Sequence, residues 1–85
     1  MTGYQAEVRI TPRTGLLDPE GKAVEHALQS LDFADVEEVR VGRLVRLRVR
    51  AATEAAARMH LDEMCRKLLA NPVTEDYEIT LRTVS

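Results

Sequence analysis

The feature that most constrains the fold is a regular alternation of apolar and polar residues over Tyr4–Thr11. A period of two is typical of a β-strand that buries one face of a sheet and leaves the other in water. Pro12 ends the run, because proline has no N–H to donate to a neighbouring strand. A half-buried strand is stable only with further strands beside it and other elements over its apolar face. The rest of the chain must therefore supply both.

A helix is predicted to begin at Asp18-Pro19. The Asp18 carboxylate can accept hydrogen bonds from the free N–H groups of a first turn, and Pro19 suits the first helical position. Gly21 disfavours a helix by up to about 1 kcal/mol relative to alanine, and a close packing contact would explain it. Apolar residues recur at spacings of three and four and form one stripe along the helix. The stripe consists of Val24, Ala27, Leu28 and Leu31.

Two strands joined by a tight turn are predicted next. Val36–Val41 and Leu44–Arg50 flank Gly42-Arg43, and glycine at the first turn position suits a two-residue hairpin. In the second of these strands, valine and leucine alternate with arginine. We expect the arginines on the solvent face, where acidic residues of neighbouring strands could pair with them.

A second helix and a last strand complete the pattern. Thr53 can cap the helix, and Asn71-Pro72 ends it. The final strand is expected over Glu75–Thr83, with Tyr77, Ile79 and Leu81 buried. The helix has an apolar stripe and opposite charges four positions apart on its exposed side. The stripe is Ala57, Leu61, Met64, Cys65 and Leu68, and the pairs are Arg58 with Asp62, Asp62 with Arg66, and Glu63 with Lys67.

The predicted order is therefore β-α-β-β-α-β in one domain over residues 1–85. Two helices on one face of a four-stranded antiparallel sheet, joined by right-handed crossovers, make a ferredoxin-like α+β sandwich. A chain of 85 residues buries only about 60% of the surface that its unfolded state exposes, so association would add stability. Many unrelated activities use this fold, so the fold alone does not predict a function.

Charge and composition narrow the classes of function. The formal net charge is −2, whereas a protein that binds nucleic acid by neutralising phosphates is normally basic. The solvent face of the predicted sheet carries mixed charges and no aromatic side chain for base stacking, which argues against an RNA platform. No apolar run approaches the ~20 residues that a membrane span needs, and no signal peptide is evident. We expect a cytoplasmic protein that binds neither nucleic acid nor membrane.

No catalytic or metal-binding constellation is evident in the sequence. Cys65 lies on the apolar stripe of the second helix, so we expect a buried, unreactive thiol. His26 and His60 fall on different helices, with no third ligand at a suitable spacing. No glycine-rich phosphate loop is present. Gly15 and Gly21 flank a helix N-terminus, which we interpret as a capped helix after a turn rather than as an anion site.

Three parts of the chain resemble the PurS family, the small subunits of phosphoribosylformylglycinamidine synthase. They are Leu17–Leu28 after the first strand, Val39–Arg43 at the predicted hairpin, and Met64–Val73 with Glu75–Tyr77 near the end. The two long segments are specific, and the resemblance spans nearly the whole chain in the right order. The Leu44–Arg50 strand departs from the family pattern, because it carries more arginine than is usual there.

The resemblance implies a non-catalytic subunit of an ATP-dependent, glutamine-hydrolysing ligase in purine biosynthesis. In that complex the PurS subunit, as a homodimer or homotetramer, links a large synthetase subunit to a glutaminase subunit and assists ammonia transfer between them. ATP, Mg²⁺ and glutamine are used by the partner subunits. This chain itself is expected to hold no catalytic residue, no metal and no cofactor.

Partner contacts are expected at the loop edges and on one helix. Turn geometry or solvation explains each of these positions equally well. Two alternatives stay open, namely a regulatory domain that binds a small effector between subunits and a stand-alone enzyme. The expected contact residues are Arg13, Gly15, Leu17, His26, Gly42, Arg43, Asn71 and Pro72.

Overall fold

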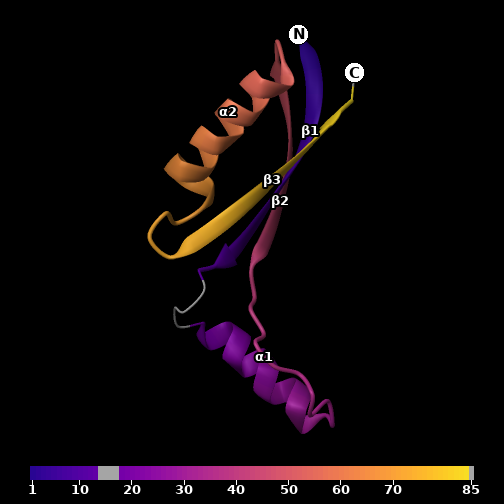
Figure 1. Ribbon diagram of the computed structural model, residues 1–85, viewed down its shortest axis with the longest axis vertical. Coiled ribbons are helices and arrows are strands. Elements are labelled where there is room, and N and C mark those ends of the chain that lie inside the picture. Colours follow the sequence, from indigo (N-terminus) through magenta and orange to yellow (C-terminus); the bar gives the residue numbers. More distant parts are fainter. Residues whose placement is uncertain (14–17, 85) are drawn as a thin grey trace.

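The computed structural model describes residues 1–13 and 18–84 and has an α+β architecture (Figure 1). The strands predicted from Tyr4, Leu44 and Glu75 onward and both helices are confirmed. In chain order the elements are β1 (Thr2–Pro12), α1 (Pro19–Ser30), β2 (Arg43–Ala51), α2 (Glu54–Met64), the π-helical turn η1 (Cys65–Leu69) and β3 (Glu75–Thr83).

β1 lies in the middle of an antiparallel sheet whose strand order is β2-β1-β3. Val8 stands opposite Val45 of β2 and Ile79 of β3. The apolar residues of all three strands therefore share one face, as their alternation predicts. The charged residues share the other face, and β2 and β3 form the two edges of the described sheet.

The helix α2 covers the apolar face of the sheet (Figure 1). Thr53 caps its start, as predicted. The hydroxyl oxygen of Thr53 accepts a hydrogen bond from the N–H of Ala56 at 3.1 Å. Val8 of β1, Leu61 of α2 and Cys65 of η1 are each 0% exposed. Burying one large apolar side chain contributes about 1.5–3 kcal/mol. The expected burial of the Cys65 thiol is confirmed, and this burial raises its pKa.

The turn η1 changes which residues after α2 face the core. The N–H of Ala70 donates to the carbonyl of Cys65 at 3.0 Å, so this turn is wider than an α-helical turn. The extra residue turns Leu69 and Ala70 toward the sheet, where they join the core around Cys65. Leu68 is 83% exposed instead. The prediction that Leu68 belongs to the buried stripe is wrong for this reason.

The segment after α1 departs from the predicted sandwich. Val36–Val41 is not a strand, and Gly42-Arg43 forms no hairpin turn, because the chain passes into β2 without reversing (Figure 1). The described sheet has three strands, so the predicted fourth strand is not found in a single copy.

Side chains of α1 bind backbone groups of this segment and hold it against the helix. The N–H of Val39 donates to Glu25 Oε1 at 3.4 Å, and the N–H of Val41 donates to Asp18 Oδ2 at 3.2 Å. The amide of Gln29 also donates to the carbonyl of residue 36 at 3.0 Å. Residues 36–41 therefore run along α1 and not along β2.

Residues 18–42, here termed the α1 arm, extend beyond one end of the sheet (Figure 1). The prediction that both helices cover the sheet is wrong for one copy, since only α2 does. The apolar stripe of α1 lacks a cover, and Leu31 is 67% exposed. The radius of gyration is 16.4 Å, whereas a compact domain of this length would have about 12 Å.

Gly21 is the buried residue of α1 and allows the arm to close on itself. A Cβ atom on Gly21 would lie 2.4 Å from the carbonyl oxygen of Val39, far inside van der Waals contact. The close packing contact expected for this glycine is therefore confirmed. Only a residue without a side chain lets residues 36–41 lie so near the helix.

Replacing Gly21→Ala is expected to release residues 36–41 from α1, although alanine favours a helix by about 1 kcal/mol over glycine. The amides of Val39 and Val41 should lose protection in an NMR hydrogen-exchange experiment. The matched control is Ala23→Gly at an exposed position of the same helix, which lowers helix propensity without touching the contact. Unchanged exchange at Val39 in Gly21→Ala would contradict the role given to this glycine.

Candidate functional site

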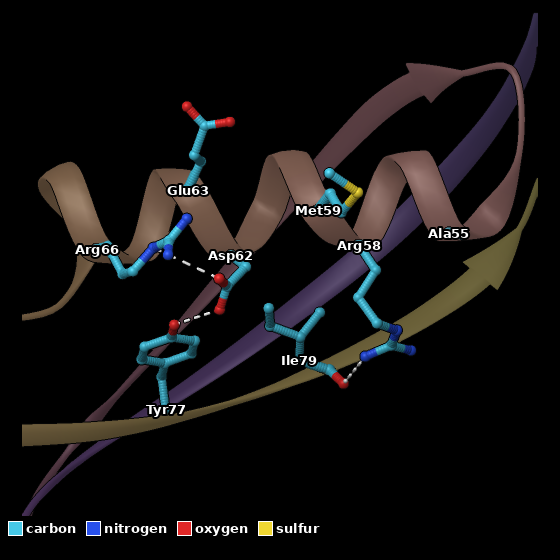
Figure 2. Close-up of a pocket in the computed structure, with 8 residues that line it drawn as sticks. All are labelled: Ala55, Arg58, Met59, Asp62, Glu63, Arg66, Tyr77 and Ile79. Atoms are coloured by element: carbon cyan, nitrogen blue, oxygen red, sulfur yellow. Dashed lines mark hydrogen bonds and ion pairs between the residues drawn. The ribbon is translucent and has the colours of Figure 1, made fainter.

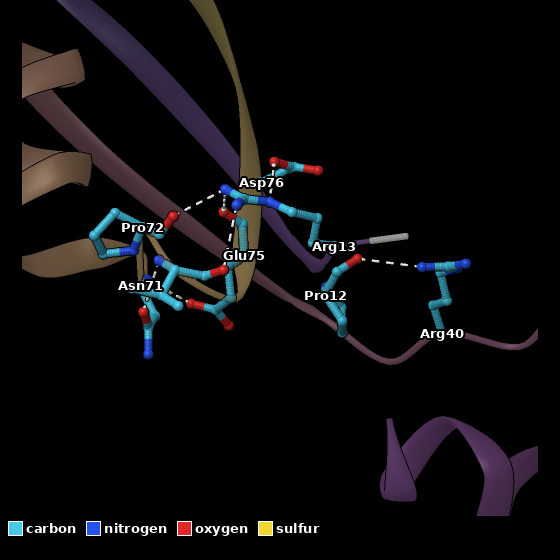
Figure 3. A network of polar contacts seen from close by, with 8 residues as sticks. Pro12, Arg13, Arg40, Asn71, Pro72, Glu75 and Asp76 are labelled. Carbon is cyan, nitrogen blue, oxygen red and sulfur yellow. Dashed lines mark hydrogen bonds and ion pairs between the residues drawn. The ribbon is translucent and has the colours of Figure 1, made fainter. Parts of the chain in front are cut away.

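Four of the predicted contact residues come together at one end of the sheet, and Figure 3 shows three of them, Arg13, Asn71 and Pro72. They come from the end of β1, the start of β2 and the loop before β3, and two acidic residues of β3 lie among them. This cluster is termed the arginine corner. It comprises Arg13, Arg43, Asn71, Pro72, Glu75 and Asp76.

Arg13 ties the end of β1 to the loop that precedes β3. Its backbone N–H donates to the carbonyl of Thr74 at 2.8 Å. Its guanidinium donates to Asp76 Oδ1 at 3.2 Å and to the carbonyls of Val73 and Pro72 at 3.2 and 2.9 Å. Arg13 therefore fixes the path of this loop with bonds from both its backbone and its side chain.

Arg43 makes the second set of contacts in the corner. Its two terminal nitrogens donate to the two carboxylate oxygens of Glu75 at 2.8 and 3.0 Å, a bidentate pair. It also donates to the carbonyl of Leu69 at 2.6 Å, and the N–H of Asn71 donates to Glu75 Oε1 at 2.8 Å. The hydrogen bonds from Arg43 and Asn71 favour the ionised form of Glu75 and lower its pKa.

The loop Asn71–Thr74 is held by its own side chains as well. Asn71 Oδ1 accepts a hydrogen bond from the N–H of Val73 at 3.0 Å, and Pro72 fixes the backbone angle between them. Asn71, Pro72 and Val73 are exposed. The corner therefore presents a rigid outer surface, while its arginines are engaged with carboxylates and carbonyls of the same chain.

The remaining predicted contact residues lie elsewhere or outside the described residues. Gly42 adjoins the corner, where an added Cβ would lie 2.2 Å from the carbonyl oxygen of Ile10, so glycine is required by a close approach to β1. His26 is exposed on α1, away from the corner. Gly15 and Leu17 lie outside the residues that the structure describes. The structure thus brings together Arg13, Gly42, Arg43, Asn71 and Pro72 and leaves His26 apart.

A shallow groove between α2 and β3 carries a second polar cluster (Figure 2). The hydroxyl of Tyr77 donates to the carboxylate of Asp62, and Arg66 lies 3.4 Å from the same carboxylate. The bond to Asp62 raises the pKa of Tyr77, because it favours the protonated hydroxyl. Arg58 donates to the carbonyl of Ile79 at 3.2 Å, where the sequence predicted a pair with Asp62.

Two functional residues of the corner were missed from sequence. Glu75 and Asp76 hold the two arginines, yet the sequence placed them in the last strand and in a family-like segment without naming them as contact residues. A signal was present, because both follow the predicted Asn71-Pro72 corner within four residues and a carboxylate is the strongest partner for an arginine. The pairing of Tyr77 with Asp62 had no such signal, since it depends on how α2 crosses the sheet.

The described residues offer no group poised for catalysis. Cys65 is buried and its pKa is raised, so its thiol is neither accessible nor ionised at neutral pH. Within residues 1–13 and 18–84, no three His, Cys, Asp or Glu side chains cluster in a way that could hold a metal ion. No helix of the described chain is long and apolar enough to cross a membrane.

Comparison with known proteins gives one consistent result. The family model described as PurS, phosphoribosylformylglycinamidine (FGAM) synthase, matches residues 5–83. A PurS subunit of that synthase from Synechocystis is 44% identical over 79 residues, covering 91% of this chain and 79% of the relative.

Solved structures agree with this result. The crystal structure of Methanocaldococcus jannaschii PurS has a TM-score of 0.83 and 38% identity, over 96% of this chain and 99% of that one. A chain in the structure of PurLQS from Thermotoga maritima has a TM-score of 0.85 and 28% identity, over 99% of this chain and 100% of that one.

Replacing Glu75→Gln is expected to lower the free energy of unfolding by about 1 kcal/mol at pH 7, because the charged, bidentate pair with Arg43 is lost. Since the folded-state pKa of Glu75 is lowered, its stabilisation is complete above the unfolded carboxyl pKa of about 4.3. It disappears as pH falls through the folded-state value. Urea denaturation from pH 7 to pH 3 should therefore show the two proteins converging in acid.

The matched control is Glu78→Gln on the same strand, since Glu78 has no ion pair among the described residues. Its stability should differ from wild type by less than about 0.5 kcal/mol. A loss in Glu75→Gln that persisted unchanged at pH 3 would contradict an electrostatic role for Glu75.

Proposed function

This chain belongs to the PurS family of phosphoribosylformylglycinamidine synthase subunits, and we propose that it serves that ligase complex as a non-catalytic scaffold. It would hold a large synthetase subunit and a glutaminase subunit in register, so that ammonia released by the glutaminase reaches the synthetase. The likeness to a chain of Thermotoga maritima PurLQS supports the presence of such partners. Family membership does not favour the regulatory-domain alternative.

The arginine corner carries this proposal. Arg13 and Arg43 use their donors on carboxylates and carbonyls of the chain itself, so they hold a surface in shape and do not await a phosphate. The exposed loop at Asn71 and Pro72 is the part of this surface that a partner subunit would contact. In this proposal ATP, Mg²⁺ and glutamine are bound by the partner subunits, and the complex works in the cytoplasm.

We further propose that the scaffold is a homodimer in which two copies exchange their α1 arms. In one copy the arm leaves its own sheet uncovered, and Val24 and Leu31 of its apolar stripe are exposed. A groove of suitable character lies between α2 and β2, where Leu47, Met64 and Leu68 form an apolar lining. The α1 stripe of a second copy would fill this groove.

The exchange would also complete the predicted ferredoxin-like sandwich. β2 is an edge of the described sheet, and an unpaired edge invites a further strand. Residues 36–41 of the second copy, pairing along β2, would make the fourth strand, and its α1 would be the second helix on the apolar face. Because each copy gives and receives one arm, the assembly closes as a two-fold dimer.

Omitting this chain from a reconstituted complex is the test of the scaffold. Glutamine-dependent synthesis of formylglycinamidine ribonucleotide should collapse, because ammonia would no longer pass between the two active sites. The separate glutaminase and synthetase sites should remain intact. Full glutamine-dependent activity without this chain, or turnover by this chain alone, would show the proposal to be wrong.

A charge placed in the groove tests the dimer. Leu68→Glu should raise the dimer dissociation constant by about tenfold or more, because a carboxylate buried against α1 of the second copy is strongly disfavoured. The matched control is Met59→Glu, because Met59 is also largely exposed but lies on α2 and lines the other groove, toward β3. Analytical ultracentrifugation measures both. Equal effects of the two substitutions would argue against arm exchange.

A further inference from the structure

We propose that Arg48 and Arg50 of one copy clamp the acidic tip of the other copy's α1 arm, an inference that rests on the homodimer proposed above. The acidic tip is the group of carboxylates at the far end of the arm, and the two arginines are termed the edge arginines. The acidic tip consists of Asp32, Asp35, Glu37 and Glu38.

The charges of this chain are strongly divided between the arm and the rest. Residues 18–42 carry seven acidic and two basic side chains, a net charge of −5, whereas the remainder carries seven acidic and ten basic side chains, a net charge of +3. The overall value of −2 therefore hides two regions of opposite sign. Regions with opposite charge attract one another and fix the orientation of an interface.

The edge arginines have no acidic residue directly opposite them in their own sheet. On the charged face, Arg46 pairs with Glu7 of β1 at 2.9 Å. Arg48, by contrast, stands opposite Gln5, and Arg50 stands opposite Gly3. Neither forms an ion pair with any described residue, and both are exposed. Two adjacent positive charges on the free edge of the sheet are left for a partner to neutralise.

The arm exchange brings the acidic tip to this place. β2 runs from Arg43 to Ala51, and a fourth strand made of residues 36–41 would lie antiparallel to it. The start of one antiparallel strand lies beside the end of its neighbour. The acidic tip, at the start of the fourth strand, would therefore lie beside Arg48 and Arg50 at the end of β2.

The acidic tip of a second copy is a better partner for these arginines than a nucleic acid or a small anion. Among the described strand positions, the charged face has no aromatic residue on which a nucleic-acid base could stack. Neither of the two grooves described above is lined by the edge arginines. A complementary acidic segment of the right length belongs to the same chain, and the exchange needs no further component.

Charge reversal in two separate variants tests the clamp. The first variant reverses charges of the arm and carries Glu37→Lys with Glu38→Lys. The second reverses the edge arginines, in the part of the chain outside the arm that is here termed the body, and carries Arg48→Glu with Arg50→Glu. Each alone should dimerise about tenfold or more weakly than wild type, because like charges then meet at both arm sites. An equimolar mixture should form a heterodimer of near wild-type affinity, since every arm in it meets a body of opposite charge.

Native mass spectrometry and sedimentation velocity report the species formed, and circular dichroism shows that each variant is folded. A chain that carries all four substitutions should dimerise with itself. The matched control is Arg82→Glu, which lies on the same face in the row of Gln5 but on the other edge strand, and it should dimerise like wild type. Raising the salt from about 0.1 M to about 1 M should weaken the wild-type dimer by screening the clamp.

The possible failures are distinguishable. A wild-type chain that stays monomeric would overturn the homodimer and the clamp together. A wild-type dimer that tolerates the reversed body, or that loses as much affinity with Arg82→Glu, would overturn the clamp alone. The chain with all four substitutions could also regain dimerisation while the mixture does not. This result would show that arm and body pair within one chain, and it would contradict the clamp as well.

Discussion

The contact between Gly21 and the carbonyl of Val39 is the constraint on which the rest of the structure depends. It allows residues 36–41 to lie along α1, where Asp18 and Glu25 accept their backbone hydrogen bonds. A segment held in this way cannot fold back onto β2 of its own copy. The sheet is then left with an open edge, α2 with an open groove and α1 with an exposed stripe. In the proposed dimer, each of these surfaces would meet its complement on a second copy.

The parts of the fold that sequence predicts well are those fixed by local periodicity. The alternation from Tyr4 and from Glu75 gives the strands and their buried faces, because a strand turns successive side chains to opposite sides. Thr53 marks the start of α2 through a hydrogen bond made within one turn. Four of the six residues of the arginine corner were predicted as contact residues, and two of these, Asn71 and Pro72, signal a turn through their own backbone chemistry.

Contacts between residues far apart in the sequence were not predictable from the same patterns. An apolar stripe such as that of α1 shows that the helix packs against something, but not whether the sheet it covers belongs to its own copy. The widened turn at Cys65 exposes Leu68 through one hydrogen bond, from the N–H of Ala70 to the carbonyl of Cys65, and no residue type in the sequence indicates this bond. The carboxylate of Glu75 likewise accepts hydrogen bonds from Arg43 and Asn71, and only folding brings these residues together.

The central claim is that this subunit acts through surfaces completed by an exchanged arm. Isotope-filtered NMR on an equal mixture of ¹³C-labelled and unlabelled chains tests it most directly, since the filter retains only contacts between copies. The account predicts contacts from the methyl groups of Val24 and Leu28 in one copy to those of Leu47 and Leu68 in the other. The same contacts seen only within one copy, or not at all in a dimer, would contradict it.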